Sequence, residues 1–591
     1  MDHGIFCIDG DASNIEKRPG DSVITLECGL NLTFDSSIAQ EIALDDWRFI
    51  FYGEYRACPD LHRVRDLIRS ESYDQLWGTR GILIVIAPED DRILVFNDCY
   101  GSNAIYFHNN PGAGYPVAAD SLRRFPSEDI DWVSFYEFLS YGYTVGEHSL
   151  IENVSRLMAN SMLEIGVKKS SVYAKVVSLH NFWLIDARPV NNKIDNIIDV
   201  LRVESGKLAK PQIMMSGGWD SRLLLAALRG VSPQLYTHGD LESRETAIVR
   251  DISQTYNFTL FEKSFTNIEF SNDLFSRYLI NNESMMFTHW DAAGKVAEDS
   301  GCVLTAGTLG EFLGGHYGML NMMGSREKYF SLLMHTLGIG EVFDRFLNQS
   351  QGLTYLKRIL SSRGYGAFWM LKDDVGSQLK DLDIVNISNQ RLSKVISGYA
   401  DQGIDDVRTL FERFYTEHRG GRYINLQLTN AINQNCYRNI YTNRDLVEIG
   451  STIPFGFRAH NKINKSVIER VAPELLDFPM AATLANASRP LVVQEFSRAL
   501  RKQVEKQGFS HALYRKLSRY GDKRFGWNNF RNVVNDSLID QLDGILNWDF
   551  WDQGKIRLKV SENSRGSNGY SMFDMLSKAA TIDWQVKGEL R

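Results

Sequence analysis

The feature that most constrains this chain is a short glycine-containing segment between an expected strand and an expected helix. Residues 210–215 form an apolar run of strand length, residues 216–221 read SGGWDS, and the helical sequence RLLLAALRG follows. Such a turn exposes backbone N–H groups at a helix N-terminus, where the helix dipole favours an anion. Gly217 and Gly218 allow the backbone to approach that anion closely. The segment therefore predicts a phosphate-binding loop beside a parallel strand.

The side chains of this segment fit the same interpretation. The hydroxyls of Ser216 and Ser221 can add hydrogen-bond donors. Asp220 cannot favourably face a phosphate alone, so we expect it to hold Mg²⁺, which bridges phosphate oxygens. The spacing differs from a Walker loop, which needs GxxxxGK[ST]. The alternative interpretation is a Gly-Gly turn followed by an aspartate that caps the helix.

The flanking sequence changes character near residue 194. Before it, β-rich runs broken by Gly, Asp and Pro predict a layered antiparallel α+β domain, with strands at 22–28, 47–52, 81–87, 92–97, 161–166 and 171–177 and a helix at 131–140. After it, strands alternate with helices, which predicts a doubly wound parallel sheet with strands at 210–215, 234–237, 258–262 and 303–305 and a helix at 244–256.

The chain length sets the expected domain organisation. A chain of 591 residues is too long for one ordinary hydrophobic core. We expect a first domain at 1–185 and a parallel-sheet domain at 190–480 with helical insertions. Residues 481–591 are expected to form a helical, aromatic-rich extension of the second domain. The periodicity is mostly helical between residues 327 and 531.

The composition excludes some classes of binding partner and indicates where the protein is located. The formal net charge is −8, which argues against a general nucleic-acid or membrane binder because both need a basic face. The six cysteines include no CxxC pair, which is typical of reduced thiols in the cytoplasm. The first residues lack the features of a signal peptide, and no apolar run has the length of about 20 residues that spans a bilayer. We therefore expect a cytoplasmic protein.

The segment SGGxDS resembles the PP-loop of ATP pyrophosphatases, which split ATP between the α and β phosphates. With that loop located, most of residues 1–475 resembles the asparagine synthetase family. The resemblance is carried by residues 95–106, similar to "RDxxGxxPLY", and by residues 117–125, 156–165, 182–183, 236–239, 244–247, 304–317, 437–447 and 460–468. It implies an Ntn-hydrolase-like glutaminase domain followed by an adenine nucleotide α-hydrolase-like synthetase domain.

The resemblance also implies roles for particular residues. ATP is expected to bind at Met214, Ser216, Gly217, Gly218, Asp220, Ser221, Thr237 and His238. Mg²⁺ is expected at Asp220 and Glu311. The expected catalytic residues are Glu311, Arg438 and Lys462, with Lys465, one helical turn later, as the alternative to Lys462.

The N-terminal segment departs from the family pattern. The family's nucleophilic cysteine follows the initiator methionine, and its free amine lies beside its thiol. Here the corresponding position holds His3, preceded by Asp2, and Cys7 lies too far into the chain. The family's "NGE" triplet reads YGE at residues 52–54. We therefore expect that the first domain does not hydrolyse glutamine.

The acidic loop, residues 307–311, also departs from the family pattern. The family's "GEGSDE" supplies two acids before its last glutamate, whereas this chain has Gly307 and Gly310 at those positions and retains only Glu311. Losing a carboxylate should weaken Mg²⁺ binding, because Mg²⁺ depends on few, well-placed oxygens.

Three functions remain open from the sequence. The first is an ATP-dependent ligase that adenylates a small-molecule or peptide carboxylate for attack by ammonia or an amine. Such a ligase could be a homodimer. β-Lactam synthetases, lasso-peptide cyclases and proteins of polysaccharide pathways are similar, and the sequence does not choose among them. The second is a non-catalytic nucleotide-binding or scaffold protein. The third, a tRNA-modifying PP-loop enzyme, is disfavoured by the acidic charge.

Overall fold

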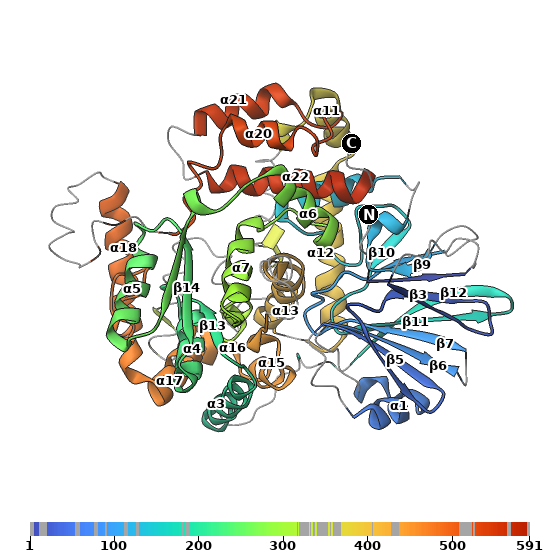
Figure 1. Cartoon of the computed structure of the whole chain (residues 1–591), viewed down its shortest axis with the longest axis horizontal. Helices are drawn as coiled ribbons and strands as arrows, with labels where there is room; N and C mark the ends of the chain where they lie inside the picture. Colours follow the sequence, from blue (N-terminus) through green and yellow to red (C-terminus); the bar gives the residue numbers. More distant parts are fainter. Residues whose placement is uncertain are drawn as a thin grey trace.

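The protein combines two antiparallel sheets, one parallel sheet and a helical C-terminal part, in the arrangement drawn in Figure 1. A computed structural model describes residues 5–10, 20–53, 60–75, 81–88, 91–110, 116–125, 129–179, 181, 183, 190–315, 317, 330, 333–334, 337, 339, 353–354, 356–357, 368–404, 406–426, 437–506, 520, 523, 526–563 and 569–587. The expected α+β region followed by a parallel sheet is confirmed at this level.

The N-terminal half contains two six-stranded antiparallel sheets. The first has the order β10-β8-β9-β1-β3-β2, with β1 (Phe6–Asp9), β2 (Asp21–Thr25), β3 (Asn31–Asp35), β8 (Tyr106–His108), β9 (Pro116–Ala119) and β10 (Val154–Arg156). The second has the order β12-β11-β7-β6-β5-β4, with β4 (Gln40–Leu44), β5 (Trp47–Tyr52), β6 (Ile82–Ala87), β7 (Arg92–Phe96), β11 (Ser161–Lys168) and β12 (Ser171–Ser178).

Strand β6 explains how the layers are held together. Its sequence ILIVIA is apolar at every position, and every residue is buried. Because side chains alternate across a strand, Ile82, Ile84 and Ile86 enter the core shared with the first sheet. The other three side chains enter a separate core with α1 (Leu61–Arg69). The second sheet is therefore buried on both faces, by the first sheet and by α1.

The parallel sheet has four strands in the order β15-β14-β13-β16. They are β13 (Pro211–Met214), β14 (Gln234–Gly239), β15 (Leu260–Ser264) and β16 (Val303–Ala306). The chain runs outward from β13 to β14 and β15, and β16 then pairs with the opposite edge of β13. The strand order therefore changes direction at β13. In open α/β sheets, ligands bind at the carboxyl ends of strands where the order reverses.

Helices accompany and follow this sheet. Those between its strands are α4 (Trp219–Leu228), α5 (Arg244–Tyr256), α6 (Asn272–Asn282) and α7 (Asp291–Asp299), and α3 (Val190–Gly206) precedes it. The later helices include α11 (Asp373–Asp381), α12 (Ile384–Asp401), α13 (Val407–Phe414), η12 (Tyr415–Ile424), α15 (Arg444–Ser451), α16 (Phe455–Arg458), α17 (Lys462–Val471), α18 (Leu491–Lys506), α20 (Asp536–Leu542), α21 (Gln553–Asn563) and α22 (Tyr570–Lys587). Within the described residues, no helix combines the length and apolar character needed to cross a bilayer.

The C-terminal helices pack against the N-terminal half. Helix α22 lies against α2 (Trp132–Tyr141). Between them, Trp551 stacks on Phe135 with ring centroids 5.7 Å apart. Both rings belong to a hydrophobic core that continues through the parallel sheet. The N-terminal half and the helical part are therefore packed as one body around α2.

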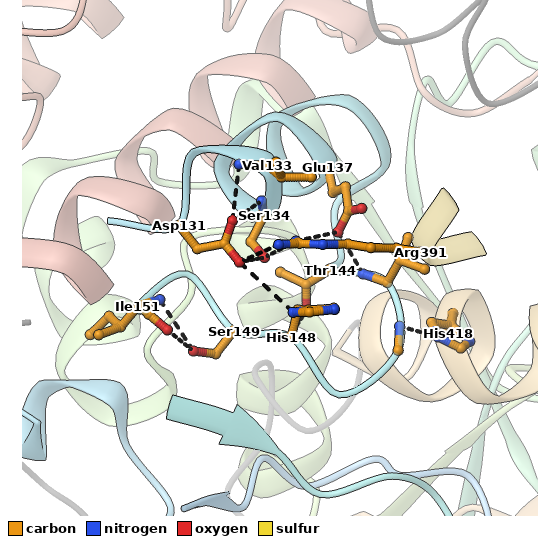
Figure 2. Close-up of polar contacts among 12 residues, drawn as sticks. Asp131, Val133, Ser134, Glu137, Thr144, His148, Ser149, Ile151, Arg391 and His418 are labelled. Atoms are coloured by element: carbon orange, nitrogen blue, oxygen red, sulfur yellow. Dashed lines mark hydrogen bonds and ion pairs between the residues drawn. The ribbon is translucent and has the colours of Figure 1, made fainter. Parts of the chain in front are cut away.

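Polar contacts between α2 and α12 reinforce this packing (Figure 2). Asp131 accepts hydrogen bonds from the Val133 and Ser134 amides and so caps α2. Arg391 on α12 donates to Asp131 at 2.7 Å. Glu137 is fully buried beside Arg391, and burial raises the pKa of its carboxyl to about 8. Glu137 is therefore mainly protonated at pH 7, which avoids the cost of a buried charge.

A second link joins the loop after α2 to helix η12. His418 accepts a hydrogen bond from the Gly146 amide at 3.0 Å through Nε2, and its Nδ1 lies 3.0 Å from the Phe414 carbonyl (Figure 2). These contacts place the proton on Nδ1. Burial lowers the pKa of His418 well below its usual range, so the ring stays neutral.

Candidate functional site

The segment at residues 216–221 lies where the sequence predicts it: it follows β13, and its last three residues form the first turn of α4. The two serines bind each other: Ser216 Oγ and Ser221 Oγ are 3.0 Å apart, and the Ser216 amide donates to Ser221 Oγ at 3.2 Å. Ser216 Oγ also accepts from the Gly218 amide at 3.2 Å. The hydroxyls therefore fix the shape of the loop as well as offering groups to a ligand.

The two glycines have different surroundings. A Cβ on Gly217 would lie 2.7 Å from the Cβ of Ala481, whose amide donates to the Gly217 carbonyl at 3.3 Å. Gly217 is therefore needed for close packing against the chain. Gly218 is partly exposed and is the N-cap of α4, where it offers no side chain to the first helical amides. Gly218 thus leaves the helix N-terminus accessible to an anion.

Asp220 lies in the first turn of α4 and is held on two sides. Its backbone carbonyl accepts a hydrogen bond from Tyr441 O–H at 2.8 Å. Its carboxylate accepts from Asn464 Nδ2 at 3.0 Å. Burial, followed by the negative charge of Glu311, raises the pKa of the Asp220 carboxyl well above its usual value.

Glu311 approaches Asp220 from the loop after β16. The final residues of the two strands, Met214 and Ala306, are paired in register, so their loops begin side by side. Burial raises the pKa of Glu311 as well. Because the Glu311 charge raises the pKa of Asp220, a divalent cation bound between the two carboxylates would stabilise their charged state. Among the described residues, no cluster of three or more His, Cys, Asp or Glu side chains could hold a metal.

The glycines of the acidic loop have a packing explanation. A Cβ on Gly307 would lie 2.8 Å from the Ser221 amide and 2.9 Å from the Asp220 Cβ. A Cβ on Gly310 would lie 2.8 Å from the Asp220 Cβ and 2.9 Å from the Tyr441 ring. The loop therefore lies directly against the start of α4, and neither position has room for an acidic side chain.

The expected cationic residues lie at different places. Lys462 is the first residue of α17, and its Nζ donates to the Gly456 carbonyl at 2.9 Å. Lys465 Nζ donates to the Ser488 carbonyl at 3.2 Å. The amide of Arg438 donates to the Leu304 carbonyl at 2.9 Å, which extends the parallel sheet beyond β16. Lys462 shares its helix with Asn464, which contacts Asp220.

The residues expected near the adenine base are buried. Met214 ends β13, and Thr237 and His238 lie in β14. Burial lowers the pKa of His238 to about 3. Its ring belongs to an aromatic cluster with centroids 5.3–6.1 Å away, formed by Phe265, His289, Trp290 and Trp527. The C-terminal segment thus covers this end of β14, since the Trp527 carbonyl accepts from the Asp240 amide at 2.7 Å.

The N-terminal nucleophile position lies outside the described residues, as do Asp2, His3 and Glu54. Cys7 lies within β1, and its thiol donates to Asp9 at 3.3 Å. Burial and the Asp9 charge raise the pKa of Cys7 well above its usual value. A thiol that stays protonated is a poor nucleophile. Cys7, Cys28, Cys99 and Cys302 all carry free thiols.

No family model matches this chain. A search of curated proteins likewise finds no similar sequence. The function is therefore inferred from the chain's own residues and their geometry.

Sequence reasoning missed the residues that hold the two loops together. Arg458 is buried and donates to Glu412, to the Ile453 carbonyl at 2.8 Å and to the Phe312 carbonyl at 3.0 Å, directly after Glu311. Tyr441 positions Asp220, and its own carbonyl accepts from Tyr100 of the N-terminal half at 3.1 Å. These partners lie far apart along the chain and belong to no short motif.

Proposed function

We propose that this protein is an ATP-dependent, amide-forming ligase of the asparagine synthetase type, releasing AMP and pyrophosphate. Its substrate is a small-molecule or peptide carboxylate, and its nitrogen donor is ammonia or an amine. One observation carries the proposal: the SGGWDS segment, the N-terminus of α4 and two carboxylates with interacting charges lie together where the parallel strand order reverses. That position is where open α/β sheets bind nucleotides.

The proposed first step joins the substrate to the nucleotide. A carboxylate oxygen forms a bond to the α-phosphorus of ATP, the bond between that phosphorus and the bridging oxygen breaks, and pyrophosphate leaves. The amides of the loop and of the first turn of α4 bind the phosphate oxygens. Asp220 and Glu311 would hold Mg²⁺, which supplies positive charge to those oxygens when bound. Lys462 adds a second cation from the start of α17.

The proposed second step forms the amide. The uncharged amine attacks the acyl carbon, the bond to AMP breaks, and the amine proton passes to solvent. The nitrogen donor arrives from outside, because the Cys7 thiol is buried and protonated.

A second candidate is a non-catalytic nucleotide-binding protein. The observation that favours it is the close packing at Gly310, which leaves the acidic loop with Glu311 alone. Under this alternative, nucleotide binds the loop without being cleaved.

Release of pyrophosphate distinguishes the two candidates. The full-length protein is incubated with ATP, Mg²⁺, ammonium and a panel of carboxylic acids, and pyrophosphate and AMP are measured. We expect equal amounts of both products, appearing only with a matching acid. Replacing Asp220 by alanine should lower this rate by a factor on the order of a hundred or more, because the Mg²⁺ that this carboxylate would hold offsets the negative charge of the transition state.

The matched control is Asp199→Ala, on the exposed surface of α3, which should leave the rate unchanged. Release of ADP and phosphate, or a rate indifferent to Asp220→Ala, would contradict the ligase proposal. Nucleotide binding without product formation for any acid would favour the non-catalytic candidate.

A further inference from the structure

The buried amide of Asn464 has an unusual environment. Asn464 lies on α17 and is 0% exposed. Its Nδ2 lies 3.0 Å from Asp220 Oδ1 and 3.3 Å from Asn461 Oδ1, so it bridges two oxygens. Its own Oδ1 has no hydrogen-bond partner among the described residues. Buried polar atoms are nearly always paired, so this unpaired acceptor needs an explanation.

A rotation of the amide group would give the Asn464 oxygen a partner if a cation is present, and Nδ2 would then take the position that the oxygen now holds. The oxygen and nitrogen of an asparagine amide have the same shape, and their assignment follows from their hydrogen bonds. A half-turn would place the Asn464 oxygen toward the oxygens of Asp220 and Asn461. Three oxygens without a proton between them repel one another, and a cation at their centre reverses that repulsion.

We propose that Asn464 turns its amide oxygen toward Asp220 when a divalent cation binds, so that Asp220, Asn461 and Asn464 are oxygen ligands of one cation beside Glu311. The cation is a hard ion such as Mg²⁺ or Mn²⁺, because every ligand is an oxygen. This inference rests on the proposed function, in which that cation accompanies the nucleotide.

The position of α17 supports the assignment. The Asn461 amide donates to the Gly314 carbonyl at 3.1 Å, and a Cβ on Gly314 would lie 2.3 Å from Asn461 Oδ1. The start of α17 is thus fixed against the acidic loop. Gly310 leaves no room for a carboxylate there. The oxygens missing from the acidic loop are therefore supplied from α17.

Binding of Mn²⁺ to the full chain tests this, followed by electron paramagnetic resonance with and without ATP. Asn464→Leu keeps the approximate volume and removes the oxygen, so Mn²⁺ affinity should fall about tenfold or more. Asn464→Asp keeps an oxygen and adds a negative charge, so affinity should rise above that of the wild type. The control is Asn97→Leu, another fully buried amide, which should leave the affinity unchanged.

Unchanged Mn²⁺ affinity in Asn464→Leu, or a wild type that binds no Mn²⁺ under either condition, would overturn the inference. If Asn464→Leu does not fold, an unchanged Mn²⁺ affinity in Asn464→Asp would overturn the inference. Failure of the proposed function has a different signature: Mn²⁺ binding that depends on Asn464 while ATP is neither bound nor cleaved. Pyrophosphate release with Mn²⁺ binding indifferent to Asn464 would leave the proposed function standing and refute this inference.

Discussion

Replacing Arg458 by methionine is expected to lower the free energy of unfolding by about 3–5 kcal/mol. The Arg458 and Glu412 side chains are 2% and 0% exposed, so the substitution leaves a buried carboxylate without the guanidinium that hydrogen-bonds it. It also removes the donor to the Phe312 carbonyl, which fixes the acidic loop next to Glu311. The measurement is urea unfolding followed by tryptophan fluorescence, compared at the first transition.

Two further variants separate charge from packing. In Arg48→Met, the lost ion pair with Glu41 is largely exposed, so the expected cost is below about 1 kcal/mol. The double variant Arg458→Met with Glu412→Leu should recover much of the lost stability, because both members of the buried ion pair are replaced by apolar side chains. A single Arg458 variant as stable as the Arg48 variant would contradict the role given to this ion pair.

Replacing Gly310 by aspartate introduces the acid that the asparagine synthetase family has at the corresponding position, but it is expected to damage the protein. The new Cβ would lie 2.8 Å from the Asp220 Cβ and 2.9 Å from the Tyr441 ring. Overpacking of this kind and a third buried carboxylate should together cost about 3 kcal/mol. The unfolding temperature and the rate of pyrophosphate release should both fall below the wild-type values.

The matched control is Gly376→Asp on α11, where an added Cβ meets nothing within 4 Å. That variant should unfold within a few degrees of the wild type, since surface changes usually stay within about 0.5 kcal/mol. Faster pyrophosphate release in Gly310→Asp than in the wild type would show that the loop has room for an acid, contrary to the packing described here.

Local patterns allowed much of the fold to be predicted. Strand β5 at residues 47–52 and helix α5 at residues 244–256 have the predicted bounds. Strand β15 begins two residues later than predicted. The reason is local: Asn257, which caps the C-terminus of α5, has the left-handed conformation, with φ of 56°. The chain must therefore turn there before it can extend into the strand. Such end effects are not encoded in hydrophobic periodicity.

The candidate site was predicted only in part. The position of the loop followed from the motif and the parallel strands, whereas the pairing of Asp220 with Glu311 was expected only from the resemblance to the asparagine synthetase family. The packing role of Gly217 depends on Ala481, more than 250 positions later, and the cover on β14 depends on Trp527. Contacts between such distant positions arise from tertiary packing, and no short window of sequence contains them.

Calorimetry with a non-hydrolysable ATP analogue and Mg²⁺ shows directly whether the loop after β13 binds the phosphates of a nucleotide. The decisive variant is Gly218→Asp. Aspartate is a favoured N-cap, and Gly218 has φ of −90° and ψ of 178°, so α4 should keep its stability. The added carboxylate would face the phosphates and repel them.

We expect one nucleotide to bind per wild-type chain, and we expect Gly218→Asp to lose that binding without a lower unfolding temperature. The control Gly230→Asp, where an added Cβ meets nothing within 4 Å, should bind like the wild type. A wild-type chain that binds no nucleotide, or a Gly218→Asp chain that binds as tightly as the wild type, would contradict this expectation.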